Sequence, residues 1–476
     1  MLVAGGTLMW RQRAHSEPPV FTVAPADASA KSQGLAKDLL VKLGGLQSAN
    51  ADAPEIVDSD AADKASFILQ VSSFTQDAQV QASAALLARN HALLWSQEFQ
   101  RPSVEEADLR QQLALTAARV LACAKRGALA PDRLDQETLK LYLSGCAQTD
   151  FAPTDYRRLV PMLRELTRRA PRFDGAWALL VGREAAMMGY EQIPADSPEG
   201  LTLRNDIVEA RKINPQMPEA YFAEFKLLNG DNGLDQLDQL VARANKGAPN
   251  QPLTFVLNAT LDGFTGRMNE AASYMKQAAD ADPLDPGAIT EYINALSWAG
   301  QRDAAAQELR RAEAIWPGTQ AMLEARMRYD LRYGDPKEGL RIIRSGAAPS
   351  FLGTESFLQA RADPSKENVD RAIADARAQV GRKPNAIGSL IQVLAEFGRE
   401  DEIYALIEQE GRDAIGESYL LFRPAFHRFR QNRRFMTIAK QIGLLQYWTR
   451  TGRWPDFCFE SDLPYDCKKV AAAIAS

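Results

Sequence analysis

Histidine is scarce in this sequence, and its scarcity limits the chemistry that the chain can support. Only His15, His91 and His427 occur in 476 residues, and none of them stands in a metal-ligand spacing such as HExxH. A Walker loop, a GxGxxG turn and a GxSxG nucleophile elbow are also missing. We therefore expect no catalytic, cofactor-binding or metal site, and we predict that the protein is not an enzyme.

Basic residues are not in excess either. The chain has 56 lysines and arginines against 61 aspartates and glutamates, which gives a formal net charge of −5. Nucleic-acid-binding domains normally carry a basic excess, so we expect no nucleic-acid partner for this chain. Residues 422–435 do place arginines among phenylalanines, a pattern that could grip a phosphate backbone. An amphipathic segment with its aromatic rings buried and its arginines exposed accounts for the same pattern.

The apolar N-terminal segment is too short to span a membrane. Residues 1–10 are apolar and are followed at once by Arg11, Gln12 and Arg13. A spanning helix needs about 20 apolar residues, and a secretory signal carries its positive charge before the apolar run. We interpret residues 1–19 as a partial membrane span and linker whose first half is missing. The alternative is a frayed apolar N-terminus.

Cysteine is also rare, and the four residues fall into two local pairs, Cys123 with Cys146 and Cys458 with Cys467. Four cysteines allow three connectivities, of which local pairing is the simplest. No histidine lies near either pair to complete a zinc site. Disulfides would indicate an oxidising compartment, which in a bacterium is the periplasm; the alternative is four reduced thiols in a cytoplasmic protein. Cys146 lies several turns into the next helix, so the first disulfide forms only if that helix brings Cys146 close to Cys123.

What the sequence does contain is a repeat of 34 residues. Three residue types keep this spacing over the centre of the chain: Pro215, Pro249, Pro283 and Pro317; Ala210, Ala244, Ala278 and Ala312; Gly266, Gly300 and Gly334. A period of 34 is typical of a tetratricopeptide array, in which each unit is a helix–turn–helix stacked on its neighbours. We predict a mostly α-helical fold, with a tetratricopeptide-type α-solenoid of about seven helical pairs over residues 154–411.

In this superfamily the first helix of each unit lines the concave surface of the solenoid. Seven positions are predicted to face it: Phe222, Lys226, Val256, Thr260, Thr290, Asn294 and Ser297. Their mixed polar and apolar character indicates a protein or peptide ligand, because extended concave surfaces are what solenoids use for binding. The alternative is that these side chains are merely solvated.

A small α/β domain is predicted ahead of the array, over residues 20–125. Residues 20–23, 66–73, 78–88 and 91–99 have the pattern of strands, the last three as an antiparallel meander, and residues 32–43 have the pattern of a helix. A second helix is expected over residues 104–125, with Ser103 as its N-cap and Glu106 in the capping-box position.

This domain resembles the TolB-like domain that lies between a membrane span and a tetratricopeptide array in several bacterial signalling proteins. The resemblance is carried by residues 20–24, 34–40, 66–71, 92–99 and the helix ending at Cys123. Residues 24–26 depart from the Pro-Phe segment that usually follows the first strand of the family. The resemblance implies a binding or structural module without catalytic residues.

The C-terminal residues 412–476 lose the period and are predicted to form a helical cap that bears a disulfide. Residues 447–467 are dense in aromatic residues and proline, and we expect them to cover the last exposed helix face of the solenoid. They resemble the closing segment of membrane-anchored tetratricopeptide regulators of alphaproteobacteria, in which a cytoplasmic winged-helix domain precedes the span. The sequence given has no winged helix.

These predictions divide the chain into a partial span and linker (1–19), the α/β domain (20–125), a helical connector (126–153), the solenoid (154–411) and the cap (412–476). The preferred function is a non-enzymatic scaffold that binds a protein or peptide, anchored in the inner membrane with its bulk in the periplasm. Two alternatives remain open at this point. One is the sensory portion of a one-component transcription regulator, and the other is an accessory subunit of an enzyme.

Overall fold

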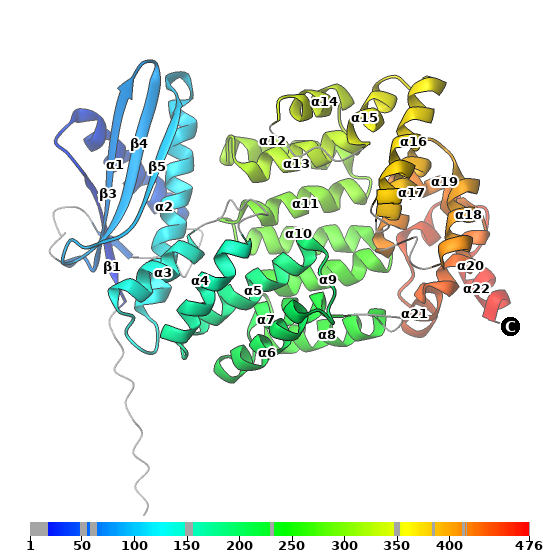
Figure 1. Ribbon diagram of the computed structural model, residues 1–476, viewed down its shortest axis with the longest axis horizontal. Coiled ribbons are helices and arrows are strands. Elements are labelled where there is room, and N and C mark those ends of the chain that lie inside the picture. The colour runs from blue at the N-terminus through cyan, green and yellow to red at the C-terminus, as the bar shows by residue number, and fades with distance from the viewer. Residues whose placement is uncertain are drawn as a thin grey trace, which may run out of the picture. The chain divides into compact units, whose positions relative to one another are not determined.

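The computed structural model describes residues 18–47, 55–57, 64–147, 156–228, 233–346, 353–382, 386–411, 415 and 417–475. The chain divides into two compact units, residues 1–147 and residues 148–476. The described residues form 22 α-helices and one five-stranded sheet (Figure 1), so the chain is mostly helical with a small α/β unit, as predicted.

The expected partial span falls almost wholly on residues 1–17, which lie outside the described residues. Within the described part of the chain, no helix combines the length and the apolar composition that a bilayer span requires.

The first unit is built on a mixed sheet with the strand order β2-β1-β3-β4-β5. Its strands are β1 (Val20–Pro25), β2 (Glu55–Val57), β3 (Phe67–Gln76), β4 (Gln79–Ala88) and β5 (Leu93–Pro102). The predicted antiparallel meander is confirmed as β3-β4-β5, and β1 pairs in parallel with both β2 and β3. Alternate side chains of β3 are buried, which explains why its two-residue periodicity was readable in the sequence.

Three helices complete the unit: α1 (Ala30–Gln47), α2 (Glu106–Ala128) and α3 (Gln136–Cys146). The predicted capping box at the start of α2 is wrong. Ser103 opens a short 3-10 turn instead, and the N–H of Glu106 donates to the carbonyl of Ser103. The Glu106 carboxylate accepts from Arg110 one turn later, at 2.6 Å, so it does not reach back to a cap. The 3-10 turn supplies a carbonyl acceptor for a backbone N–H at the start of α2, which a side-chain cap would otherwise have to supply.

Both predicted cysteine pairs are disulfides. Cys123 of α2 is joined to Cys146 of α3 with their Cα atoms 6.0 Å apart, and Cys458 is joined to Cys467 at 5.7 Å. Gly127 brings the first pair within reach, because a Cβ at this position would lie 2.7 Å from Leu139 of α3. The residues predicted to form a connector therefore include a helix that is fastened to the first unit. Two disulfides fit an oxidising compartment.

The second unit begins with fifteen helices among the described residues, many of which run side by side (Figure 1). They are α4 (Tyr156–Arg169), α5 (Asp174–Glu191), α6 (Pro198–Ile213), α7 (Pro218–Lys226), α8 (Gly233–Gly247), α9 (Pro252–Phe264), α10 (Met268–Ala281), α11 (Pro286–Trp298), α12 (Arg302–Ile315), α13 (Gln320–Arg332), α14 (Pro336–Arg344), α15 (Thr354–Ala362), α16 (Lys366–Arg382), α17 (Ile387–Glu396) and α18 (Glu400–Glu410).

The starts of these helices keep the period of the sequence. Helices α9, α11 and α13 begin 34 residues apart, and so do α10, α12 and α14. Each periodic proline lies two residues beyond the end of a helix, namely α6, α8, α10 and α12, as expected of a residue that cannot continue one. The four periodic alanines are all buried, with at most 1% of their surface exposed. Small residues at these positions let neighbouring helices approach closely.

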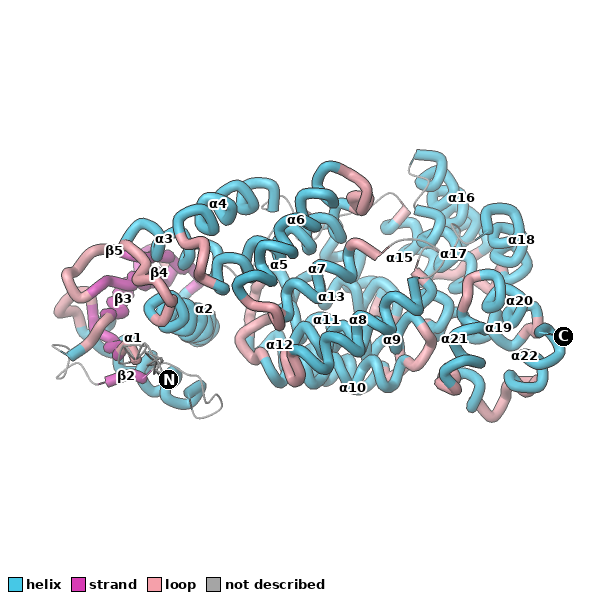
Figure 2. Tube along the Cα trace, turned by 90° about the horizontal axis from the view of Figure 1, so that it is seen from below, coloured by secondary structure: helices cyan, strands magenta, loops and turns pink. Residues whose placement is uncertain are grey.

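The C-terminal segment contains η6 (Ser418–Phe422), η7 (Pro424–Phe426), α19 (His427–Gln431), α20 (Arg434–Gln441), α21 (Leu444–Thr451) and α22 (Cys467–Ala475). It packs against α18, where the hydroxyl of Tyr404 donates to the carbonyl of Phe429. It also returns to the middle of the helical array, as Figure 2 shows for α21 beside α8 and α9. A single hydrophobic cluster contains residues from Tyr221 to Met268 and from Ile373 to Ala471.

Three hydrogen bonds fix this return. The indole of Trp448 donates to the carbonyl of Thr265 at 2.9 Å, the hydroxyl of Ser418 donates to the carbonyl of Phe264 at 2.7 Å, and the N–H of Asp456 donates to the carbonyl of Gly266 at 3.0 Å. Gly266 has a φ of +85°, and a Cβ there would lie 2.6 Å from the ring of Phe422. The periodic glycine after α9 therefore serves both the turn and the close approach of the C-terminal segment.

Asp262 of α9 lies at this junction and gives a pH-dependent prediction. Its side chain is 1% exposed and accepts from Arg267 at 2.9 Å and from Arg453 at 2.7 Å. Burial raises the pKa of Asp262 to about 6, outweighing the two arginines, which act to lower it. Because the folded pKa lies above the unfolded value, this carboxyl stabilises the fold most below pH 4, and that stabilisation is lost as the pH rises through 6.

We therefore expect the wild type to lose about 2 kcal/mol of unfolding free energy relative to Asp262→Asn between pH 4 and pH 7. Urea denaturation of both proteins at a series of pH values measures this difference. An unchanged difference contradicts the prediction and means that the arginines cancel the effect of burial. A difference that moves in favour of the wild type as the pH rises also contradicts it and means that the arginines outweigh burial.

For the basic run at residues 422–435, the predicted burial of the aromatic rings is confirmed, but the predicted exposure of the arginines is not. Its four phenylalanines are buried, which confirms that the aromatic rings point inward. The arginines do not all point outward: Arg423 is 8% exposed and Arg430 is 4% exposed. The guanidinium of Arg430 donates to the carbonyls of Leu421 and Arg423, at 2.8 and 3.0 Å, and thereby satisfies backbone groups of the irregular 3-10 region. The sequence pattern alone could not reveal this use of arginine.

Candidate functional site

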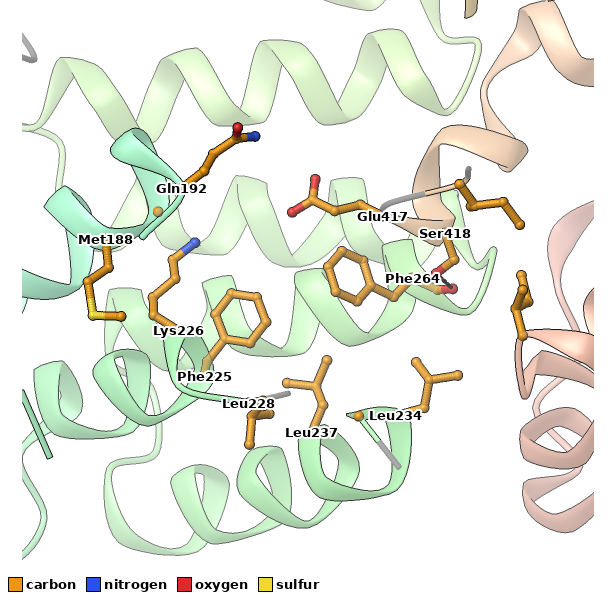
Figure 3. A pocket seen from close by; sticks show the side chains of 14 residues that line it. Met188, Gln192, Phe225, Lys226, Leu228, Leu234, Leu237, Phe264, Glu417 and Ser418 are labelled. Atoms are coloured by element: carbon orange, nitrogen blue, oxygen red, sulfur yellow. Dashed lines mark hydrogen bonds between the residues drawn. The ribbon is translucent and has the colours of Figure 1, made fainter. Parts of the chain in front are cut away.

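The second unit contains a cavity of about 320 Å³ between its helices and the start of the C-terminal segment. Helices α5, α7, α8 and α9 contribute to its wall, and Ile415, Glu417 and Ser418 close another side. The residues that define its chemistry are Met188, Gln192, Phe225, Lys226, Leu234, Leu237, Phe264, Glu417 and Ser418 (Figure 3). Most of the lining residues are apolar, and a few polar groups lie among them, as is usual for ligand sites.

Lys226, the last residue of α7, supplies the positive charge of the cavity. Its ammonium lies 4.8 Å from the centroid of the Phe225 ring and 5.3 Å from that of Phe222. Among the described residues, Lys226 has neither a hydrogen-bond nor an ion-pair partner. Burial lowers the pKa of this ammonium, while the carboxylates of Glu417 and Glu291 act in the opposite direction. A partly buried cation held mainly by aromatic faces is available to a ligand.

Gly189 of α5 makes room for this lysine. A Cβ at position 189 would lie 3.2 Å from both the Cε and Nζ atoms of Lys226. Such a contact is tighter than ordinary packing, so a side chain here would displace the lysine. The absence of a side chain at position 189 thus lets the ammonium enter the cavity.

Glu417 faces Lys226 from the other side of the cavity. Figure 3 shows the ammonium and the carboxylate pointing into the space from opposite sides, with the rings of Phe225 and Phe264 below them in this view. The phenyl ring of Phe264 stacks on Tyr419 at a centroid distance of 5.9 Å, which ties α9 to η6 beside the cavity. The site therefore presents one cation and one anion across an apolar surface.

The seven positions predicted to line a groove divide into three groups. Lys226 lines the cavity, and the ring of Phe222 lies beside its ammonium. Val256 and Thr260 of α9 are partly exposed but lie outside the cavity wall. The remaining three, Thr290, Asn294 and Ser297 of α11, are at most 5% exposed.

Two of the three buried positions are explained by local hydrogen bonds. Thr290 donates to the carbonyl of Pro286 at 2.9 Å, and Ser297 donates to the carbonyl of Ile293 at 2.8 Å. Both are hydroxyl groups satisfied by their own helix one turn back, a common solution for buried serine and threonine. These side chains lie between helices and present no open surface to a ligand.

A second group of polar side chains lies around His427 of α19. Its Nδ1 atom lies 3.2 Å from Glu460 and its Nε2 atom 2.9 Å from Asp462, and these three residues are close enough together to share a metal ion. Each ring nitrogen already has a carboxylate partner, and Gln431 bonds to Asp462 as well, at 3.1 Å. The cluster is accounted for as a hydrogen-bonded link between α19 and the loop at residues 460–462.

The cavity at Lys226 has a chemistry suited to binding. It offers an ammonium to an acidic group, a carboxylate to a basic or amide group, and aromatic and aliphatic surface to an apolar group. Glu417 and Ser418 could not be placed there from the sequence, because they follow the periodic region and reach α7 and α9 only through the fold. No protein-family model matches this chain, and no curated protein matches it.

Proposed function

We propose that this protein is a non-enzymatic scaffold that binds a peptide segment of a partner protein in the cavity at Lys226. The observation that carries the proposal is the ammonium of Lys226, which lies on aromatic rings across from Glu417 without a hydrogen-bond partner among the described residues. The segment that fits has an apolar side chain between an acidic group, which meets Lys226, and a basic or amide group, which meets Glu417.

The proposal includes a tetratricopeptide-type solenoid of seven helical pairs, from α5–α6 to α17–α18. Two features support it. Helix starts repeat at 34 residues over the central units, and the first helices of successive pairs contact one another at α5–α7, α7–α9 and α11–α13. Lys226 lies on such a first helix, which is the position that lines the concave surface in that superfamily.

We further propose that the first unit is a TolB-like module and that the chain is anchored in the inner membrane with its bulk in the periplasm. The two disulfides support an oxidising location for both units.

Selection of random displayed peptides against the full oxidised chain tests the binding proposal. We expect selected peptides to share an acidic group next to an apolar residue, and we expect Lys226→Met to weaken them about tenfold or more. The reason is that a partly buried charge-assisted hydrogen bond contributes about 1.5–3 kcal/mol. Fluorescence anisotropy with the labelled peptides measures the change.

Lys246→Met is the matched control, because Lys246 lies exposed on α8 and its loss changes the net charge equally. Peptides that bind this control as tightly as the wild type, but bind Lys226→Met weakly, support the cavity. Equal binding to all three proteins would place the peptide elsewhere.

A further inference from the structure

A second, smaller cavity in the same unit is lined by three arginines. Its volume is about 90 Å³, and its wall includes Arg302 from the start of α12, Arg332 from the end of α13, and Arg423 from the residue between η6 and η7. None of these residues belongs to the cavity at Lys226. Three guanidinium groups from separate parts of the chain therefore converge on one small space.

The most buried of the three is Arg423, which is 8% exposed. Its guanidinium carbon lies 4.6 Å from the ring centroid of Trp298 and 4.9 Å from that of Tyr419, and one of its terminal nitrogens donates to Gln392. The Nε–H of Arg423 is buried and has no hydrogen-bond partner among the described residues. A buried N–H donor without an acceptor lowers the stability of the fold, so an arginine in this state favours binding of a group that accepts a hydrogen bond.

Arg332 has even fewer partners. Its Nε atom is also buried without an acceptor, and it forms no hydrogen bond or ion pair within the described ranges. Burial, and then the positive charge of Arg423, lower the pKa of Arg332 to about 10. Arg302 is exposed at the rim of the cavity, with its guanidinium 5.9 Å from the ring centroid of Tyr333.

The acidic groups near this cavity do not neutralise the positive charge of its three arginines. Glu396 is the acid among the lining residues, and it accepts from Arg361 at 3.1 Å. Arg361 itself adds another positive charge beside the three that line the space. Guanidinium groups this close together repel one another, so a negative charge bound in the cavity would stabilise them.

We propose that this cavity binds an oxyanion, namely a phosphate or carboxylate group, through Arg302, Arg332 and Arg423. Arginine offers planar forks of N–H donors that match both groups, often through two parallel hydrogen bonds. The cavity is well below the roughly 300–1,000 Å³ of a typical small-molecule site, so it takes a single anionic group, free or at the end of a larger ligand. The site does not depend on the proposed peptide cavity.

Titration calorimetry with the full oxidised chain tests the proposal directly. Inorganic phosphate, acetate and a phosphate monoester are titrated separately, with sodium chloride holding the ionic strength constant. We expect saturable binding of at least one of them, and the preferred one identifies a free phosphate, a carboxylate or an esterified phosphate. Arg302→Gln and Arg332→Gln should each weaken it about tenfold, the effect of losing one hydrogen bond to a charged group.

Two further variants separate binding in the cavity from attraction by surface charge and from misfolding. Arg310→Gln removes a charge from the exposed face of α12, away from the cavity, and should leave binding unchanged. Arg332→Lys keeps the charge but loses the fork, and it should fold normally and still bind more weakly than the wild type. Without phosphate, Arg332→Gln should unfold at the same temperature as the wild type or higher, because it relieves repulsion with Arg423.

The proposal is overturned if none of the three anions binds saturably to the wild type. It is also overturned if Arg310→Gln weakens binding as much as the cavity variants do, since the anion is then held by surface charge alone.

Discussion

Replacing Trp448 with alanine should lower the unfolding free energy of the second unit by about 4 kcal/mol. The side chain is completely buried, and its ring lies 6.2 Å, centroid to centroid, from each of Phe422, Phe457 and Trp454. Its indole N–H also donates to the carbonyl of Thr265, and the substitution removes this donor. The loss combines a large cavity with a buried polar group deprived of its partner.

Urea denaturation followed by circular dichroism measures this change, and hydrogen exchange locates it. Exchange should accelerate in α9, although Trp448 is 183 residues away from Thr265 in the sequence. Phe459→Ala is the control within the same segment, because Phe459 is 73% exposed and its loss should cost no more than about 0.5 kcal/mol. A cost for Trp448→Ala as small as that of the control would mean that the C-terminal segment does not hold α9.

The second large effect is expected in the first unit. Replacing Cys123 and Cys146 together with alanine should cost about 3 kcal/mol, because the disulfide closes a loop of 23 residues and limits the unfolded chain. Since the pair joins α2 to α3, protease cleavage at residues 129–135 between these helices should separate them only in the variant or after reduction.

The matching pair in the second unit serves as the control. Cys458→Ala with Cys467→Ala should shift the unfolding of the second unit and leave that of the first unit unchanged. Mass mapping without reduction should find Cys123 joined to Cys146 and Cys458 joined to Cys467. Free thiols at these positions in protein from an oxidising compartment would falsify both the pairing and the proposed location.

The repeated elements could be predicted because each one depends on a short stretch of sequence. Pro283 ends a helix wherever it stands, and Ala278 must be small because another helix passes close to it. The strands of the first unit were predictable for the same reason, since alternation along β3 is a local pattern. The strand β2 escaped prediction because three residues are too few to show a periodicity.

The candidate site could be predicted only in part, because its walls come from distant segments. Lys226 was identified by its place in a repeating unit, but Glu417 lies outside any repeat and reaches the cavity through the return of the C-terminal segment. The burial of Arg423 was missed for a related reason. A basic residue among aromatics suggests a solvated charge, and only the fold shows that Trp298 and Tyr419 enclose it.

The return of the C-terminal segment to α9 changes how this helical array should fold. In an open array each unit contacts only its neighbours, so stability grows by nearest-neighbour increments and the ends fray first. Here the final helices are anchored to units near the middle, and separation of either partner exposes the same hydrophobic cluster. Residues 221–268 and 373–471 should therefore unfold as one cooperative body, and the long-range contacts between them should slow their folding compared with an open array of the same length.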